Sequence, residues 1–500
     1  PAAWVLDLIA RTGGAVTIAS NRALQFGAGT GTYHLNGGTL KLANLSFADA
    51  AKNRLAFGGG TLENNGSALL TTAIPVELKA GGGRISTPTA SAGIHLTGPI
   101  SGTGRLTKTG DGTLQLSAAA GSTFSGDIYI DAGEIVVDNN NLPTTRGTVR
   151  VGTSSSGTGA LTLSDWSLRT TSYFMLGAGG SIDSVGVLNM SSGQIEVGST
   201  MYLGWKGSGT VNQTGGTVIV THPNGIHVAT DIDGTTGIYN LHGGTLRTPQ
   251  INIAAGIAQN RITLLSFDNG GTLENSGSGL MTTAIPDEFT TGGGVINTPG
   301  GGADIRLTGS MSGSGRLTKS GDGTLQLSAA AGSTFNGDIY IDAGEVVVAN
   351  NNLPTTRGSV RVGTSSSGTG TLTLSDWSLR TTSYFMLGAG GSIDSVGVLN
   401  MSSGQIEVGS TMYLGWKGSG TVNQTGGTVI VTHPNGIHVA TDIDGTTGIY
   451  NLHGGTLRTP QINIAAGIAQ NRITLLSFDN GGTLENSGSG LMTTAIPDEF

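Results

Sequence analysis

The chain of 500 residues contains no cysteine, so disulfide bonds and thiolate metal sites are excluded. Only 11% of its residues are charged, against about 25% in typical soluble domains, and the net charge of −8 is not clustered. The sequence therefore offers no basic surface for nucleic acid or anionic lipid. Its apolar runs are too short for a membrane-spanning helix, which needs roughly 18 residues.

Neither end of the chain carries a recognisable export or anchoring signal. Pro1–Asp7 lacks the basic start of a signal peptide. Phe500 corresponds to Phe289, where an earlier copy of the same sequence simply continues. We expect both ends to be cuts through a longer array.

Glycine is abundant, with 87 residues, but it shows no three-residue period, which excludes collagen. Hydrophobic residues still make up 36% of the chain and alternate with polar ones over four or five positions. These short runs end at Gly, Ser, Asn or Pro, which is the punctuation of strands and turns. The pattern predicts an ordered all-β protein.

A long internal repeat dominates the sequence. Residues 104–289 recur as 315–500 at an offset of 211 with six substitutions, and 161–289 recur unchanged. Residues 61–75 match 272–286 at the same offset, so a diverged copy precedes them. We predict one continuous solenoid made of a partial, diverged copy (1–103), a full copy (104–314) and a truncated copy (315–500).

A shorter repeat lies inside the long one. Turns begin at Gly159, Gly186, Gly209 and Gly237, with spacings of 27, 23 and 28 residues, and each holds three short strands. This pattern predicts a right-handed parallel β-helix with about eight turns in each copy. At about 4.8 Å per turn, some nineteen turns would form a rod on the order of 90 Å long.

Side-chain alternation predicts three internal walls and three outward columns. The walls are Leu161, Leu163, Leu188, Met190, Val211 and Leu241; Leu168, Ile195, Val197, Val218, Val220 and Leu246; and Phe174, Leu176, Met201, Leu203, Ile226, Val228, Ile251 and Ile253. The columns are Thr162, Asn189, Asn212 and Asn240; Arg169, Glu196, Ile219 and Arg247; and Met175, Tyr202, His227 and Asn252.

Corner positions carry their own expectations. Gly193, Gly216 and Gly244 occupy equivalent corners, where we expect a left-handed backbone, and Trp166 takes this place one turn earlier. The longer turn 139–147 is expected to loop outside the coil.

The sequence predicts no catalytic, cofactor or metal site. Asp165, Asp183, Asp231 and Asp233 fit turn or capping roles better than catalysis. The segment 231–235 lacks the remaining ligands of a calcium loop, and His222 and His227 lack a third zinc ligand.

The best candidates for surface contact are exposed aromatic and amide side chains, for stacking on a sugar or for lateral association. They are Tyr202, Trp205, His227, Asn189, Asn212 and Asn240.

The segment 104–137 reads Gly-Arg-Leu-Thr-Lys-Thr-Gly-Asp-Gly-Thr-Leu-Gln-Leu, followed after six residues by Thr-Phe-Ser-Gly-Asp-Ile-Tyr-Ile-Asp-Ala-Gly-Glu-Ile-Val-Val, and it recurs at 315–348. It resembles the autotransporter-associated β-strand repeat of passenger regions in large bacterial surface proteins. The resemblance implies export, a β-helical passenger and a cell-surface or extracellular location, and it implies no catalytic residues.

These observations favour a non-enzymatic extracellular β-solenoid that acts as a stalk, fibre, filament or adhesin passenger. Its expected partners are other copies of itself, end to end or laterally, or a host or matrix surface, with polysaccharide as a further partner. The alternative is a carbohydrate-binding or carbohydrate-degrading β-helix, which would need convergent carboxylates or a continuous aromatic groove.

Overall fold

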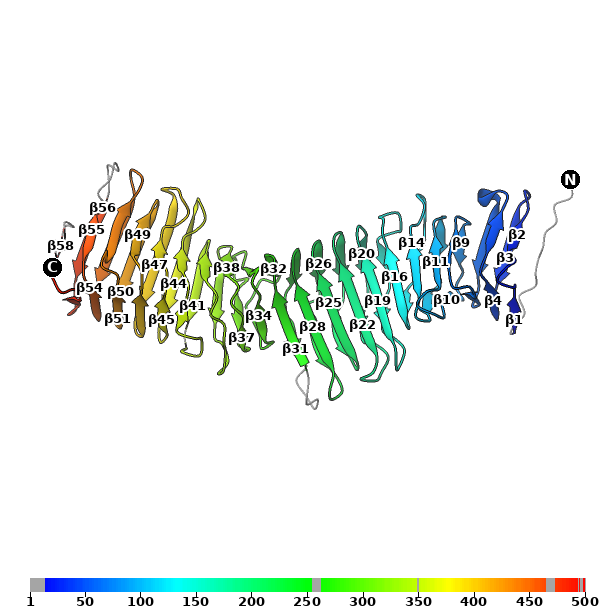
Figure 1. Ribbon diagram of the computed structural model, residues 1–500, viewed down its shortest axis with the longest axis horizontal. Helices are drawn as coiled ribbons and strands as arrows, with labels where there is room; N and C mark the ends of the chain where they lie inside the picture. Colours follow the sequence, from blue (N-terminus) through cyan, green and yellow to red (C-terminus); the bar gives the residue numbers. More distant parts are fainter. Residues whose placement is uncertain are drawn as a thin grey trace. The chain divides into compact units, whose positions relative to one another are not determined.

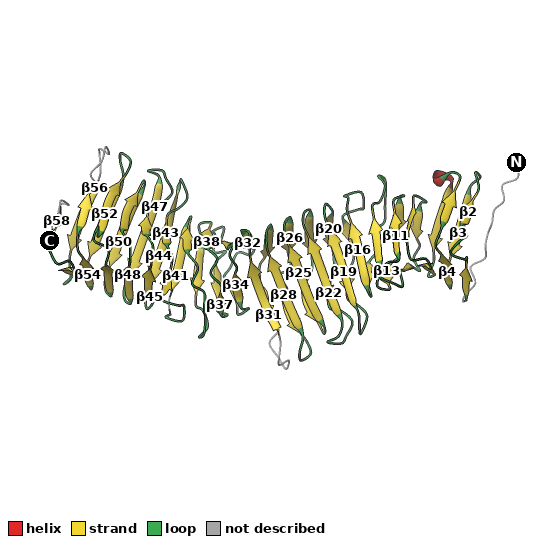
Figure 2. Cartoon of the chain, in the orientation of Figure 1, coloured by secondary structure: helices red, strands yellow, loops and turns green. Residues whose placement is uncertain are grey.

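The computed structural model describes residues 14–253, 262–348, 350–464, 473–492, 494 and 498–499. By its internal contacts the chain divides into two units, Pro1–Leu264 and Leu265–Phe500. Each unit is a stack of short parallel strands (Figures 1 and 2), and the helix found in the described residues is a single 3-10 turn, η1 (Ala50–Lys52). The copy boundaries predicted from the repeat, 103/104 and 314/315, stay a prediction.

The first unit contains three long sheets, whose strands follow one another turn by turn. Sheet 1 holds β1 (Ala15–Thr17), β4 (Thr39–Leu42), β7 (Thr61–Asn64), β10 (Gly83–Ser86), β13 (Leu106–Thr109), β15 (Ile128–Ile130), β18 (Val149–Val151), β21 (Phe174–Leu176), β24 (Met201–Trp205), β27 (Ile226–Thr230) and β30 (Ile251–Ile253). Sheet 2 holds β8 (Leu69–Thr72), β11 (Gly93–Leu96), β14 (Thr113–Leu116), β16 (Gly133–Val137), β19 (Thr158–Leu163), β22 (Val185–Met190), β25 (Ser208–Gln213) and β28 (Thr236–Leu241). Sheet 3 holds β17 (Thr145–Arg146), β20 (Ser167–Thr170), β23 (Gln194–Val197), β26 (Thr217–Val220) and β29 (Thr245–Thr248). Smaller sheets join β2 (Leu24–Phe26) to β5 (Leu45–Phe47), and β3 (Gly31–Leu35) through β6 (Asn53–Phe57) and β9 (Val76–Leu78) to β12 (Ile100–Gly102).

The second unit repeats this arrangement. Sheet 4 holds β32 (Gly271–Asn275), β35 (Gly294–Asn297), β38 (Leu317–Ser320), β40 (Ile339–Ile341), β43 (Val360–Val362), β46 (Phe385–Leu387), β49 (Met412–Trp416), β52 (Ile437–Thr441) and β55 (Ile462–Ile464). Sheet 5 holds β33 (Met281–Thr283), β36 (Ile305–Leu307), β39 (Thr324–Leu327), β41 (Gly344–Val348), β44 (Gly368–Leu374), β47 (Ser395–Met401), β50 (Ser419–Gln424), β53 (Thr447–Leu452), β56 (Ile473–Phe478) and β58 (Asp498–Glu499). Sheet 6 holds β42 (Thr356–Arg357), β45 (Ser378–Thr381), β48 (Gln405–Val408), β51 (Thr428–Val431), β54 (Thr456–Thr459) and β57 (Thr483–Asn486). β31 (Ile262–Phe267) pairs with β34 (Asp287–Phe289), and β34 pairs with β37 (Met311–Ser312). The predicted all-β parallel solenoid is confirmed.

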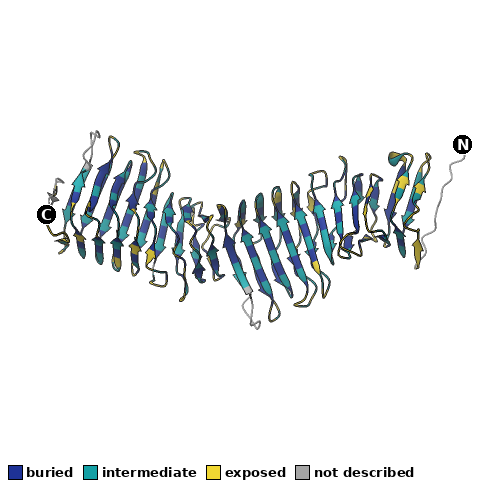
Figure 3. Ribbon diagram, in the orientation of Figure 1, coloured by how far each residue is buried: buried dark blue, intermediate teal, exposed yellow. Residues whose placement is uncertain are grey.

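The register between turns matches the prediction. Leu161 pairs with Leu188, and Leu188 with Val211, in parallel strands. Nearly every residue of the predicted walls is buried (Figure 3), with Leu188 and Val211 both 0% exposed. Ile253 is the exception because it is half-buried: it lies in β30, which is the last strand of sheet 1 among the described residues.

Two polar residues belong to the first internal wall, although the predicted wall did not include them. Gln213 and Tyr239 point inward from β25 and β28 and are buried. The Tyr239 hydroxyl donates to Gln213 Oε1 at 2.6 Å, and Gln213 Nε2 donates to the carbonyls of Gly216 and Thr245. Since all these polar groups are bonded, the pair lies in the core without a large desolvation penalty. Burial raises the pKa of Tyr239, so its hydroxyl stays protonated.

The long turn does not simply loop outside the coil, as predicted, because part of it enters the core. Leu142 is buried, and β17 places the Arg146 guanidinium between the rings of Phe124 and Trp166, at 4.9 and 4.7 Å from their centroids. Arg146 also donates to the carbonyl oxygens of Gly126 and Phe124 inside the coil. Burial lowers the Arg146 pKa to about 10, so it remains charged at neutral pH.

The glycine corners adopt the expected left-handed backbone. Gly193, Gly216 and Gly244 have φ values of 82°, 69° and 69°. A Cβ atom on Gly193 would lie 2.4 Å from the carbonyl oxygen of Trp166 in the turn before. The ring of Trp166 itself is fully buried, and its Nε1 donates to the carbonyl of Leu142.

The long repeat does not contain a whole number of turns. In the second unit, residues 272–275 and 483–486 have the same sequence, yet β32 belongs to sheet 4 and β57 to sheet 6. In the first unit, β4 and β29 both follow the pattern Tyr-x-Leu-x-Gly-Gly, yet they lie in sheets 1 and 3. At both junctions, equivalent strands therefore lie on different faces of the coil.

The role of the buried arginine can be measured by comparison with an exposed one. Replacing Arg146 and its equivalent Arg357 by Ala should lower the free energy of unfolding by more than about 3 kcal/mol per site, because it leaves a cavity and unbonded carbonyls. Replacing Arg169 and Arg380 by Ala breaks exposed ion pairs with Glu196 and Glu407 and should cost less than about 1 kcal/mol per site. Urea unfolding followed by circular dichroism compares the two variants, and equal losses would contradict the structural role of Arg146.

Asp287 places a carboxyl group in the core. Its strand pairs it with Leu265 on one side and Met311 on the other. Neither carboxylate oxygen has a hydrogen-bond partner within the described residues, and burial raises its pKa well above the ordinary value. The diverged copy has Val76 at the corresponding position.

Asp287→Val should raise the free energy of unfolding at neutral pH by about 1–3 kcal/mol, because the apolar side chain needs no partner. The unfolded carboxyl releases its proton above about pH 4 while the buried one keeps it, so wild-type stability falls as the pH rises above that value. The variant should lose this fall, as measured by urea unfolding at pH 4 and pH 8. Val76→Asp is the reciprocal control, expected to destabilise the chain and to add the same pH dependence. No change in either variant would refute the assignment.

Candidate functional site

The predicted asparagine column forms a hydrogen-bonded ladder on sheet 2. Asn240 Nδ2 donates to Asn212 Oδ1 at 2.8 Å, and Asn212 Nδ2 donates to Asn189 Oδ1 at 2.9 Å. Asn189 Nδ2 donates to the Thr162 hydroxyl, which donates to Glu134 at 2.6 Å. The amides thus bind one another across successive turns, which stabilises the stacking and leaves fewer groups for an external ligand.

The same ladder is present in the second unit, formed by Glu345, Thr373, Asn400, Asn423 and Asn451.

The predicted aromatic residues come together on sheet 1. Tyr202 pairs with Met175 on one side and His227 on the other, as the register predicted. Its ring lies 5.5 Å from His227 in an edge-on arrangement and 6.4 Å from Trp205. Tyr173, in the turn before β21, lies 5.8 Å from Tyr202 and is 39% exposed.

Burial sets the charge state of this cluster. It lowers the pKa of His227, and His222 lowers it further against the opposing effect of Asp231, so His227 is neutral at physiological pH. Burial also raises the pKa of Tyr202. The aromatic surface therefore carries no charge of its own, apart from the Lys206 ammonium, which lies 5.1 Å from the centre of the Trp205 ring.

The outward column of sheet 1 continues beyond this cluster toward the N-terminus. Arg150 pairs with Met175, and Tyr129 pairs with Arg150. The guanidinium groups of Arg105 and Arg150 lie 4.8 and 5.2 Å from the centre of the Tyr129 ring. We call the whole set the aromatic strip: Arg105, Tyr129, Arg150, Met175, Tyr173, Tyr202, Trp205, Lys206 and His227.

The second unit carries an equivalent strip on sheet 4. It consists of Arg316, Tyr340, Arg361, Met386, Tyr384, Tyr413, Trp416, Lys417 and His438.

Tyr202, Trp205 and His227 were predicted from the sequence as surface-contact residues, whereas Tyr129, Arg150 and Tyr173 were not. The first two were detectable, because Ile128-Tyr129-Ile130 and Val149-Arg150-Val151 alternate in the same way as the strands that follow them. Tyr173 lies in a turn, where alternation gives no direction. The use of these residues in binding stays a prediction.

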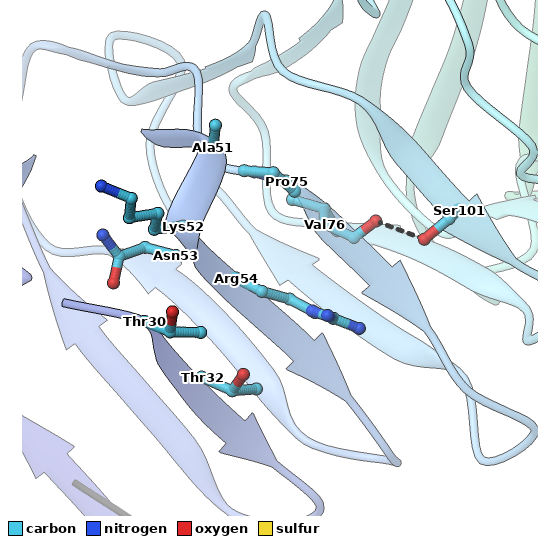
Figure 4. A pocket seen from close by; sticks show the side chains of 9 residues that line it. All are labelled: Thr30, Thr32, Ala51, Lys52, Asn53, Arg54, Pro75, Val76 and Ser101. Carbon is cyan, nitrogen blue, oxygen red and sulfur yellow. Dashed lines mark hydrogen bonds between the residues drawn. The ribbon is translucent and has the colours of Figure 1, made fainter. Parts of the chain in front are cut away.

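Two surface hollows lie away from the strip. One, of about 290 Å³, lies in the diverged copy beside η1 and is lined by Lys52, Arg54 and Ser101 among others (Figure 4). Its two cations already form ion pairs with Asp49 and Glu77. It is therefore a weaker candidate for a charged ligand than the strip.

The other hollow, of about 670 Å³, is open and is lined by Asp111, Glu134 and Asp183. The Glu134 carboxylate is bonded to Thr162 as the end of the asparagine ladder. In the part of the chain that the structure describes, no group of three His, Asp or Glu side chains is placed to hold a metal ion.

The remaining predicted candidates lie at turns. Asp165, Asp183, Asp231 and Asp233 are exposed, and Asp231 has a left-handed backbone with φ of 75°. The ring of His222 accepts a hydrogen bond from the amide of Asn224 within its own turn. Over the described residues, no helix has the length and apolar character to cross a membrane.

Comparison with known families identifies two matches to the passenger-associated-transport-repeat, at residues 106–137 and 317–348. These segments include β13–β16 and β38–β41, and each supplies the Tyr129 or Tyr340 of a strip. They lie within the segments whose resemblance to a passenger repeat was inferred from the sequence. The resemblance inferred from the sequence is thus confirmed for these two segments: the chain carries two repeats of the passenger-associated-transport type, which supports a location at the bacterial cell surface or outside the cell.

Over 334 residues the chain is 28% identical to the adhesin BmaC autotransporter of Brucella suis biovar 1 (strain 1330), a match that covers 64% of this chain. The matched region spans only 8% of that much longer protein. No solved structure matches the chain.

The asparagine ladder predicts a modest, specific contribution to stability. Replacing Asn212 and Asn423 by Ala should cost about 0.5–1.5 kcal/mol per site, because each removes a donor and an acceptor from the ladder. Thr210→Ala with Thr421→Ala, on the same strands, removes hydroxyls with no hydrogen bond among the described residues and should cost less than about 0.5 kcal/mol per site. Urea midpoints compare the pairs, and equal midpoints would show that the ladder does not stabilise the coil.

Proposed function

We propose that this chain is a non-enzymatic segment of a bacterial surface adhesin, in which stacked copies extend the passenger away from the cell. The observation that carries the proposal is the repetition of one strand register in both units, for example Leu161 with Leu188 and Leu372 with Leu399. Each added turn contributes its own core column and hydrogen bonds, so length can grow by duplication without a new fold. The similarity to an adhesin autotransporter supports the adhesin role.

A non-enzymatic role fits the surface chemistry described above. The carboxylates around the larger hollow include one that is bonded into a structural ladder. Of the acidic residues considered for catalysis, Asp165 and Asp183 lie in separate turns, and Asp231 and Asp233 share a third turn. General acid and base catalysis needs two such groups held around one substrate bond. Host or matrix surfaces, other copies of the chain and polysaccharides are the partner classes that we propose.

The second candidate function is carbohydrate binding, which one observation favours specifically. The strip aligns aromatic rings along the strand-stacking direction, with Tyr202 and His227 on adjacent turns. Sugar rings stack on aromatic faces through their C–H surfaces, and this contact needs no catalytic group. Binding of this kind is compatible with an adhesin and does not replace the first proposal.

The extension role predicts that particle length depends on copy number. Deleting residues 272–482 removes one full repeat and rejoins Gly271 to Thr483, which has the same sequence context as Thr272. Because strands stack about 4.8 Å apart, losing about eight to nine turns should shorten the particle by about 40 Å. Negative-stain electron microscopy of the purified chain and the deletion variant measures this difference. Compact particles, or equal lengths in the two proteins, would overturn the proposal.

A further inference from the structure

The aromatic strip contains cations that no carboxylate neutralises. The guanidinium groups of Arg105 and Arg150 both lie over the ring of Tyr129, and the Lys206 ammonium lies over the ring of Trp205. Within the described residues none of these three cations forms an ion pair. Arg150 Nε is buried and has no hydrogen-bond partner.

Several other arginines on the surface are neutralised by carboxylates. Arg54, Arg84 and Arg169 form ion pairs with Glu77, Asp131 and Glu196, at 3.0 to 3.1 Å. The chain has 32 acidic residues for 24 Lys and Arg, so carboxylates are plentiful. Unpaired guanidinium groups held against one aromatic ring therefore mark a place where the protein leaves donors available for an external anion.

The second unit repeats this arrangement in detail. Arg316 and Arg361 lie 4.9 and 5.0 Å from the centre of the Tyr340 ring, and Arg361 Nε is again buried without a partner. Thr371 replaces the Ala160 of the preceding copy. It lies on sheet 5, outside the strip. The strip is thus the same in both copies.

The spacing along the column suits an extended chain of sugars. Arg150 and Tyr202 lie two strands apart, a separation of about 10 Å at the usual strand spacing. The advance per residue of an extended glycan is similar to the distance between adjacent strands, so sugar rings and side chains can stay in step. Guanidinium groups bind carboxylate and sulfate through paired hydrogen bonds, and tyrosine and tryptophan faces cover sugar rings.

We propose that each aromatic strip binds an acidic polysaccharide along the coil axis, with its carboxylate or sulfate groups on Arg105 and Arg150 and its sugar rings on Tyr202 and Trp205. Arg316, Arg361, Tyr413 and Trp416 do the same in the second strip. This assignment rests on the proposed adhesin function and names its ligand class. Each unit thus supplies one binding site of its own.

The test measures binding of the whole 500-residue chain to immobilised heparin, polygalacturonate and neutral dextran. Heparin presents sulfates, polygalacturonate presents carboxylates, and dextran presents neither. The strip variant is Arg105→Gln with Arg316→Gln, both exposed, and the matched control is Arg169→Gln with Arg380→Gln, which removes the same charge from another face. Loss of charge-assisted hydrogen bonds should weaken binding of the strip variant at least about tenfold, against less than about twofold for the control. A second variant, Tyr202→Ala with Tyr413→Ala, should also weaken binding while the circular dichroism spectrum stays that of the wild type.

Retention on heparin or polygalacturonate but not on dextran, lost in the strip variants alone, supports the assignment, and the preferred column identifies the acidic group. Equal weakening in the control variant, or no retention of the wild type, overturns it. Concentration-dependent dimers that disappear on Tyr202→Ala with Tyr413→Ala, in a chain that no polysaccharide retains, would assign the strip to self-association instead. Particle length is measured in a separate experiment. A failure to bind polysaccharide would therefore leave the proposed extension role intact. Particle lengths that do not depend on the number of copies would overturn the extension role, whether or not the polysaccharide columns retain the protein.

Discussion

The structure depends on one constraint, the parallel hydrogen bonding of each strand to the equivalent strand one turn away. This pairing fixes the axial position of every residue and forces like positions into columns, inside and outside the coil. Inside, the columns become stacks such as Leu161, Leu188 and Val211. Outside, the same geometry places equivalent surface residues of successive turns next to one another. Asparagines therefore hydrogen-bond to asparagines, and aromatic rings contact aromatic rings. Core and surface are consequences of a single register.

The register also explains what the copies share and where they differ. Local pairing is the same in both units, down to the buried tyrosine–glutamine pair. At the junctions between copies, however, equivalent strands lie in different sheets, because a copy does not hold a whole number of turns. A solenoid tolerates this, since a strand needs only a parallel neighbour of suitable length and an inward face of suitable size. Duplication of such a unit therefore changes the face on which a sequence motif is presented without changing its local structure.

The sequence predicted the fold well because alternation and glycine spacing determine the register directly. The internal walls, the pair of Arg169 with Glu196 and the column through Tyr202 followed from that register alone. The prediction was wrong for the long turn, where a charged residue, Arg146, enters the core between two rings. Hydrophobicity gives no signal for a buried guanidinium whose terminal nitrogens donate to backbone carbonyls. The prediction of the site was incomplete for two reasons. Tyr173 reaches the strip from a turn, where alternation gives no direction. Whether an arginine contacts an aromatic ring or a carboxylate depends on the three-dimensional structure and cannot be read from the sequence.

The distribution of charge on the outward columns gives the surface its character. In sheet 3, Arg169 faces Glu196 on the next turn, and the opposite charges of this ion pair cancel. In sheet 1 the positions beside Arg150 are Tyr129 and Met175, which cannot neutralise it, and the rings hold the guanidinium groups in place without using their hydrogen-bond capacity. A column of this composition costs the fold little, because the core beneath it is unaffected. Arg105 is exposed, so the strip presents a guanidinium group beside the ring of Tyr129.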